Sequence, residues 1–191
     1  MSVSNDSTGI TSTIDDGRAL LSPTFLEFCA KVRSNDPSIL PEPGEPFRIL
    51  DLSEREHMEV ADALLENTCV THLQLYTDHY TKRSAEAMAK HVRTNKNLKR
   101  IRWKGSMEGI VTQRTEEILC CFLPAFQEST SLKGLHIDLP LIGGLSNLAL
   151  ENMLTHTQSL RSLTLICPVG LLVGDMTVAA ARSGLKKNTT L

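Results

Sequence analysis

Apolar residues follow a repeated pattern of strand and helix along most of the chain. A strand with one buried face is predicted by the L-x-x-L-x-L spacing of Val70, Leu73 and Leu75. Apolar residues then recur at i, i+3, i+4 and i+7, on one face of a helix, at Ala85, Met88, Ala89 and Val92. The strand spacing returns at Leu98, Ile101 and Trp103. Residues 70–98 therefore predict one strand–helix unit and the start of the next.

The strand spacing occurs five times, and each time a helical pattern follows it. The five predicted strands are Phe47/Leu50/Leu52, Val70/Leu73/Leu75, Leu98/Ile101/Trp103, Leu132/Leu135/Ile137 and Leu160/Leu163/Leu165. Their first residues are 23, 28, 34 and 28 positions apart. A polar junction precedes each later strand, as in Asn67-Thr68-Cys69 and Asn95-Lys96-Asn97. Self-similarity at such a period indicates stacked repeats rather than a single layered core.

These units resemble leucine-rich repeats of the ribonuclease-inhibitor type, which often have an N-x-T/S-L junction. The resemblance covers residues 47–191, about three quarters of the chain. It implies an α/β solenoid of about five repeats, with a curved parallel sheet on the concave side and helices on the convex side. The family usually has Asn or Cys three residues after the last strand leucine, but here those positions hold Arg55, Asp78, Ser106, Pro140 and Pro168. We therefore expect each repeat to stabilise its turn differently.

Three further expectations concern segments at the ends of the pattern and within it. Residues 1–19 are polar and predict a disordered tail, whereas residues 20–46 predict a capping helix and a linker. The helix should begin at a capping box formed by Thr24 and Glu27. Pro124 predicts a kink or break near Leu123. The sequence ends at the first residue of a sixth strand pattern, which favours a fragment of a longer protein or a second chain covering that end.

Composition and motifs favour a binding protein over an enzyme. Formal net charge is −2, so no overall field points to nucleic acid or to an anionic membrane. Five cysteines without C-x-x-C spacing favour a reducing compartment, the cytoplasm or the nucleus. The sequence has no phosphate-binding, dinucleotide-binding, serine-hydrolase or H-E-x-x-H motif. We therefore expect no cofactor, no metal and no catalysis. The oligomeric state stays open.

The candidate binding residues are the strand positions between the buried leucines, because successive side chains on a strand point to opposite faces. Across the five strands these positions form three columns: Ile49/His72/Arg100/Gly134/Ser162, Asp51/Gln74/Arg102/His136/Thr164 and Ser53/Tyr76/Lys104/Asp138/Ile166. No column repeats one residue type, as expected for a specific surface. The third strand concentrates positive charge at Arg100, Arg102 and Lys104.

These columns predict a site for a protein partner with an acidic surface, made by Tyr76, Arg100, Arg102, Lys104, His136 and Asp138. The alternative is a solvated face whose charges only keep the sheet soluble. Tyr80 is a further candidate anchor, because a tyrosine hydroxyl can stay in water while its ring is covered. Trp103 occupies an inward position and is expected in the core.

Three functions remain open at this point. The first is a non-catalytic protein–protein interaction scaffold that uses the concave strand surface. The second is a GTPase-activating protein for a small GTPase, since some of these are built on ribonuclease-inhibitor-like repeats. The third is an actin-associated cap, because the spacing of apolar residues in 70–99 resembles that of the repeats of tropomodulin.

Overall fold

A computed structural model of the 191-residue chain describes residues 21–42, 44–50, 52–105, 113–138, 144–166 and 175–191. The predicted disordered tail, residues 1–19, lies outside the described residues, and so do Asp51, Ser106, Pro140 and Pro168.

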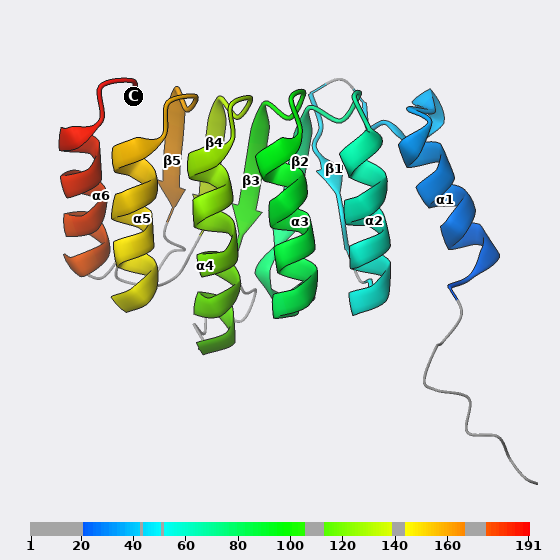
Figure 1. Ribbon diagram of the computed structural model, residues 1–191, viewed down its shortest axis with the longest axis horizontal. Coiled ribbons are helices and arrows are strands. Elements are labelled where there is room, and N and C mark those ends of the chain that lie inside the picture. Colours follow the sequence, from blue (N-terminus) through cyan, green and yellow to red (C-terminus); the bar gives the residue numbers. More distant parts are fainter. Residues whose placement is uncertain (1–20, 43, 51, 106–112, 139–143, 167–174) are drawn as a thin grey trace, which may run out of the picture.

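One five-stranded parallel sheet runs through the molecule, and its strands follow one another in sequence order (Figure 1). The strands are β1 (Phe47–Arg48), β2 (His72–Tyr76), β3 (Arg100–Lys104), β4 (Gly134–Asp138) and β5 (Ser162–Ile166). The helices are α1 (Pro23–Arg33), α2 (Glu54–Glu66), α3 (Lys82–Thr94), α4 (Gln113–Glu128), α5 (Gly144–His156) and α6 (Asp175–Lys187), with short 3-10 turns at Pro37–Ile39 and Thr77–His79. The helices form a single row along one side of the sheet. This is the predicted leucine-rich-repeat solenoid.

The strand register confirms the predicted columns from the second repeat onwards. His72, Arg100, Gly134 and Ser162 are partners on successive strands, and the next two columns align in the same way. Between the columns, the inward residues of the central strands are fully buried, Trp103 among them at 0% exposure. We call the sheet surface away from the helices the strand face.

The first repeat differs from its predicted register by three residues. Phe47 pairs with Leu73 rather than with Val70, so the inward residues are Phe47 and Ile49. Leu50, predicted to be buried, is 41% exposed. Burial requires only the two-residue period of a strand, which Phe47 and Ile49 satisfy as well as Leu50 and Leu52 do. Ile49 therefore does not belong to the outward column in which the sequence placed it.

The third column also loses its first predicted member, Ser53. This residue caps α2, where its hydroxyl accepts the backbone N–H of Glu56 and the carboxylate of Glu56 accepts the backbone N–H of Ser53. Such a reciprocal capping box satisfies two of the unpaired donors at a helix start. Ser53 is thus occupied locally and does not contribute to the strand face.

Helix α1 packs against the first repeat. Its cap is Ser22, whose hydroxyl accepts the backbone N–H of Phe25, so the predicted capping box at Thr24 and Glu27 is wrong. The ring of Phe28 stacks on that of Phe47 with centroids 6.2 Å apart. Pro23 at the first helical position explains the shift, because proline favours that position and Ser22 precedes it directly.

Asparagine side chains at the polar junctions tie each repeat to the one before. Asn95 donates to the carbonyl of Asn67 (3.1 Å) and accepts the backbone N–H groups of Asn97 (2.7 Å) and Leu98 (2.8 Å). Asn67 makes the equivalent bonds, donating to the carbonyl of Val32 in α1. The amide thus satisfies backbone groups that the helix end leaves unpaired, which is why the junctions are polar.

The junctions before β4 and β5 use serine hydroxyls in place of the asparagine amide. Ser131 donates to the carbonyl of Asn95 (2.6 Å), and Ser159 donates to the carbonyl of Ser129.

Helix α4 runs through Pro124 from Gln113 to Glu128, so the predicted break near Leu123 does not occur. The neighbouring helices α3 and α5 hold α4 on both sides, which offsets the hydrogen bond that the proline lacks.

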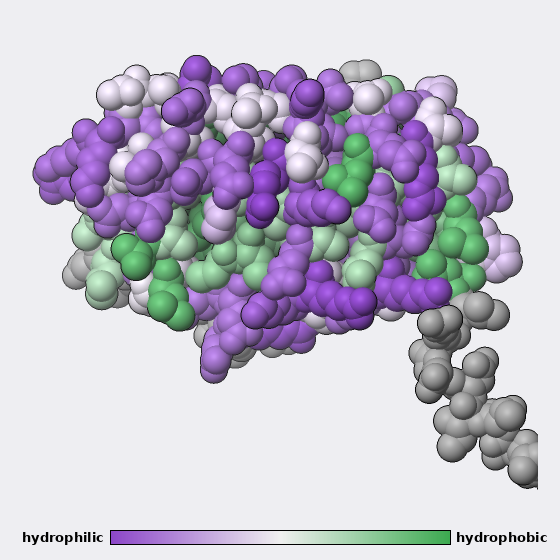
Figure 2. Space-filling model, in the orientation of Figure 1, coloured by the Kyte–Doolittle hydropathy of each residue, from purple (hydrophilic) through white to green (hydrophobic). Residues whose placement is uncertain are grey.

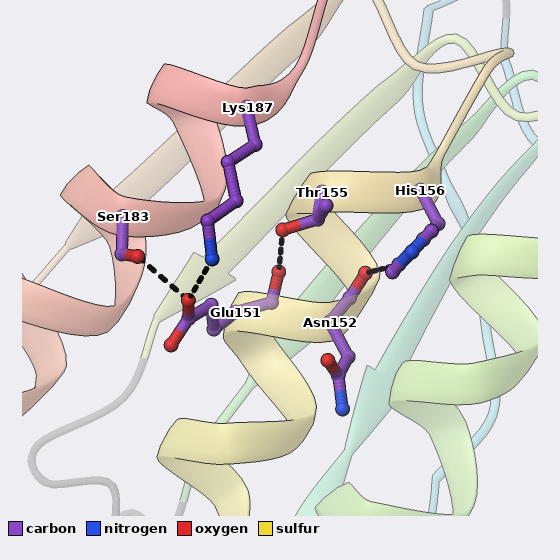
Figure 3. A network of polar contacts seen from close by, with 6 residues as sticks. All are labelled: Glu151, Asn152, Thr155, His156, Ser183 and Lys187. Carbon is purple, nitrogen blue, oxygen red and sulfur yellow. Dashed lines mark hydrogen bonds and ion pairs between the residues drawn. The ribbon is translucent and has the colours of Figure 1, made fainter.

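Polar contacts also join the helices. Figure 3 shows the carboxylate of Glu151 in α5 accepting from the hydroxyl of Ser183 (2.6 Å) and the ammonium of Lys187 (2.8 Å), both in α6. Gly184 lies between Ser183 and Lys187 in the sequence of α6, and a Cβ at this position would be 2.7 Å from the Cβ of Leu154 in α5. Glycine therefore lets α6 approach α5 closely. The helix side is mostly hydrophilic (Figure 2), although the first turns of α5 and α6 expose Leu145 and Met176.

Candidate protein-binding face

The central strand of the sheet presents its cations to solvent. In β3, Ile101 and Trp103 are buried, while Arg100 and Arg102 are exposed and Lys104 is partly buried. This alternation is the two-residue period of a strand, so core residues and surface residues alternate within the same five-residue strand. Among the described residues, neither arginine has an ion-pair partner.

The six predicted site residues lie on three adjacent strands. Tyr76, Lys104 and Asp138 are partners across β2, β3 and β4, and Arg102 is the partner of His136. The ammonium of Lys104 lies 5.8 Å from the ring centroid of Tyr76, a cation–π contact. The structure therefore brings the predicted residues together.

Two side chains on or beside this face are more buried than the sequence indicates. Gln74 occupies an outward column but is only 3% exposed, because its amide donates to the hydroxyl of Tyr76. Tyr80, expected to be a wet anchor, is fully buried between His57 (centroids 4.7 Å apart) and Phe122 (5.6 Å), and burial raises the pKa of its hydroxyl. Tyr80 is a core residue and is excluded from the binding face.

A groove of about 630 Å³ crosses the strand face over the amino-terminal halves of the strands. Four cationic side chains line it: Arg100, Arg102, Lys133 and Arg161. None of its described lining residues is a carboxylate. This separation of charge is local, because the whole chain has a net charge of −2.

Lys133 and Arg161 are members of the groove that the sequence interpretation missed. Each precedes the first residue of its strand, so neither falls in one of the three outward columns. The backbone N–H of Lys133 donates to the carbonyl of Lys99 (2.8 Å), and that of Arg161 donates to the carbonyl of Lys133 (2.8 Å). The three residues therefore form a basic row at the amino edge of the sheet. The available signal was the recurrence of Lys or Arg directly after the first leucine of three strand patterns.

Gly134 provides the space at the centre of the groove. A Cβ at this position would lie 3.3 Å from Cγ of Arg100, so even an alanine would press on the arginine stem. The outward neighbour of Gly134 on β5 is Ser162, whose side chain is small and exposed. Two small residues beside a long one leave the sheet backbone accessible between cationic side chains.

Two histidines in the groove add little charge at neutral pH. Burial, followed by the neighbouring Arg100, lowers the pKa of His72. Burial and then Arg102 lower the pKa of His136, against the opposing effect of Asp138. Both rings are therefore held neutral, and the positive charge of the groove comes from its arginines and lysine.

Within the ranges that the structure describes, no three His, Cys, Asp or Glu side chains are grouped so that they could hold a metal ion. Cys29, Cys69, Cys120 and Cys121 are free thiols, and burial raises the pKa of Cys29 to about 11. No helix in the described part of the chain is long and apolar enough to cross a membrane.

Comparison with known proteins supports the fold. No protein-family model matches the chain, and no curated protein sequence does. Among solved structures, the C-terminal domain of a tropomodulin from Caenorhabditis elegans is similar, with a TM-score of 0.57 and 10% identity over 85% of this chain and 92% of that one. The actin-binding site 2 of leiomodin-1 has a TM-score of 0.55 and 18% identity, over 87% and 92%. At these identities the similarity establishes the shared fold.

Proposed function

We propose that this chain is a non-catalytic protein-binding module whose strand face contacts the partner. The observation that carries the proposal is the central strand, where Arg100 and Arg102 are exposed and, within the described residues, unpaired. Cations that served solubility alone would lie anywhere on the surface, whereas these line one groove. Arginine is suited to such a role, because its planar fork binds carboxylates in a bidentate manner.

The site consists of Tyr76, Arg100, Arg102, Lys104, His136 and Asp138, and the partner presents an acidic surface. The repeats are of the ribonuclease-inhibitor-like type and occupy residues 47–191, with residues 20–46 as the amino-terminal cap. The free thiols suit a reducing compartment such as the cytoplasm or the nucleus.

Actin is a second candidate partner. The two solved structures named above are a tropomodulin domain and the actin-binding site 2 of leiomodin-1. Their similarity to this chain extends over at least 85% of its length. An actin-bound state would fit the main proposal, because actin would then be the protein that the strand face contacts.

Capture from a cell lysate on the immobilised chain tests the main proposal. The strand-face variant is Arg100→Ala/Arg102→Ala/Lys104→Ala, and the matched control is Arg83→Ala/Lys90→Ala/Arg182→Ala, which removes three exposed cations from the helices. We expect wild type and control to retain the same proteins and the strand-face variant to lose them. Equal capture by all three proteins would make the cations of the strand face a solvated surface.

Actin co-sedimentation tests the second candidate with the same three proteins. Filament-dependent pelleting of wild type and control, but not of the strand-face variant, would identify actin as the partner. If none of the three pellets with filaments, binding to actin filaments is excluded while the lysate experiment still decides the main proposal.

A further inference from the structure

We infer that the groove over Gly134 is a binding site for an extended acidic peptide segment, whose carboxylate side chains lie between Arg100, Arg102, Lys133 and Arg161. This inference rests on the proposed protein-binding function and adds the position, the chemistry and the spacing of what is bound.

The size of the groove suits several residues rather than a single ion. Its volume of about 630 Å³ lies within the range of small-molecule sites, roughly 300–1,000 Å³. It extends from His72 on β2 to Ser162 and Thr164 on β5. Three strand spacings separate β2 from β5, which is about 14 Å.

That width matches alternate residues of an extended chain. Side chains on one face of an extended peptide recur about every 6.6 Å, so three of them span about 13 Å. A segment that crosses the groove from β2 to β5 can therefore place acidic residues at i, i+2 and i+4 over it, within reach of the long side chains of Arg100, Arg102, Lys133 and Arg161. Gly134, at the middle of this path, puts no side chain of its own into the groove, and the stem of Arg100 lies close beside it.

The lining selects carboxylates by charge and by its donors. The arginines and Lys133 provide only donors, and the exposed hydroxyls of Ser162 and Thr164 can also donate. The guanidinium of Arg161 already donates to the carbonyls of Gln158 (3.0 Å) and Leu160 (2.9 Å), which fixes its place at the edge of the groove. Arg100 and Arg102 have no such bonds among the described residues and are free to turn towards a ligand.

Two other anionic partners fit the groove less well. A single-stranded nucleic acid is normally held by aromatic side chains on which its bases stack, and none of the described lining residues is a phenylalanine, tyrosine or tryptophan. Phosphate groups are commonly bound at helix amino termini. The groove instead lies at the amino ends of the strands, whereas the following helices begin beyond the carboxyl ends.

The binding test uses two labelled peptides and fluorescence anisotropy. One alternates glutamate with serine, and the control peptide replaces every glutamate with glutamine. We expect the full chain to bind the glutamate peptide and not the glutamine peptide, with an affinity that falls as salt is added. Equal binding of the two peptides would overturn the inference, and so would stronger binding of an oligonucleotide or of inorganic phosphate in competition.

Two variants separate entry into the groove from general attraction by charge. Arg100→Gln/Arg102→Gln removes two positive charges from the groove, and Arg83→Gln/Arg182→Gln removes two from exposed helix positions as the matched control. Gly134→Val keeps every cation and fills the centre of the groove. We expect both groove variants to weaken binding at least about tenfold, which is the loss of roughly one charge-assisted hydrogen bond, and the control to bind as wild type.

The outcomes distinguish this inference from the function on which it rests. If Gly134→Val binds the glutamate peptide as wild type does, the peptide does not enter the groove and the inference is wrong. If Arg100→Ala/Arg102→Ala/Lys104→Ala nevertheless loses the lysate partner, the strand face binds that partner outside the groove and the proposed function stands. Melting curves for both variants confirm that they are folded before binding is compared.

Discussion

The centre and the carboxyl-terminal end of the array are built from the same sequence pattern but differ in burial. In β3, Ile101 and Trp103 are buried. Of the equivalent residues in β5, Leu163 is partly buried and Leu165 is 40% exposed. β3 lies between two strands, while β5 has a partner on one side among the described residues. The difference indicates that the repeats on both sides contribute to burying a leucine, since Leu163 at the end of the sheet packs against the core but stays partly exposed.

The same comparison separates stability from recognition. The central strands carry the most deeply buried core residues on one face of the sheet and the cationic groove on the other. The terminal unit instead exposes apolar residues such as Leu165 and Val178. Stability in stacked repeats is approximately a sum of nearest-neighbour terms, so equal substitutions should have unequal effects at the two places.

The largest expected effect is that of truncating a central leucine. Leu73 is fully buried, so Leu73→Ala should lower the free energy of unfolding by about 2–5 kcal/mol, through lost burial and the cavity that remains. Leu165→Ala, with the same atoms removed, should cost less than about 1 kcal/mol, because the side chain is already in contact with water. Urea denaturation of both variants measures the difference. Similar midpoints would show that burial does not depend on the position of the repeat.

A junction asparagine should show a similar difference at a smaller scale. Asn95→Ala leaves the buried carbonyl of Asn67 and two backbone N–H groups without their partner, at a cost of about 2–3 kcal/mol. Asn188 makes equivalent bonds to Thr157, Thr190 and Leu191 but is partly exposed, so water can replace the lost amide in Asn188→Ala. Thermal unfolding should give the lower Tm for Asn95→Ala. The opposite order would contradict the role assigned to burial.

The central array should also be sensitive to acid. His91 in α3 is fully buried, and burial lowers its pKa from 6.5 to about 4. Between these values the unfolded chain binds more protons than the folded one, so the free energy of unfolding falls as the pH falls, by about 2 kcal/mol at pH 5 for this residue. His91→Leu should therefore flatten the dependence of stability on pH between 7 and 5. An unchanged slope in His91→Leu would contradict this prediction.

The smallest expected effect is that of the strand-face cations on stability. Arg100→Ala/Arg102→Ala/Lys104→Ala opens no cavity, because these side chains lie opposite Ile101 and Trp103. Each substitution should change the free energy of unfolding by no more than about 0.5 kcal/mol. Denaturation curves of the variant and of wild type should nearly superimpose. A large loss of stability would mean that the binding face and the core are not separable.

The sequence was sufficient to predict the repeats because their periodicity reflects the burial of leucines between neighbours. It misplaced the first strand because Phe47 and Ile49 fit the inward positions as well as Leu50 does, and only pairing with β2 decides between them. It predicted Arg100 and Arg102 as exposed because alternation with Ile101 and Trp103 requires it.

Other parts of the site depend on contacts that a linear pattern does not contain. Tyr80 is buried because the rings of His57 and Phe122, which come from other repeats, pack against it. Lys133 and Arg161 join the groove because strand register aligns them with Lys99. A side chain's neighbours across strands and helices thus decide whether it anchors a partner or fills the core.

Arginine footprinting of a complex tests most directly whether the strand face is the surface that binds. A partner isolated by capture on wild type would be mixed with the chain, and arginine modification by phenylglyoxal would be read by mass spectrometry with and without it. We predict that Arg100 and Arg102 become protected in the complex, while Arg83 and Arg182 on the helices keep their reactivity. Protection of Arg83 and Arg182 with continued reactivity of Arg100 and Arg102 would place the partner on the helices and contradict the account.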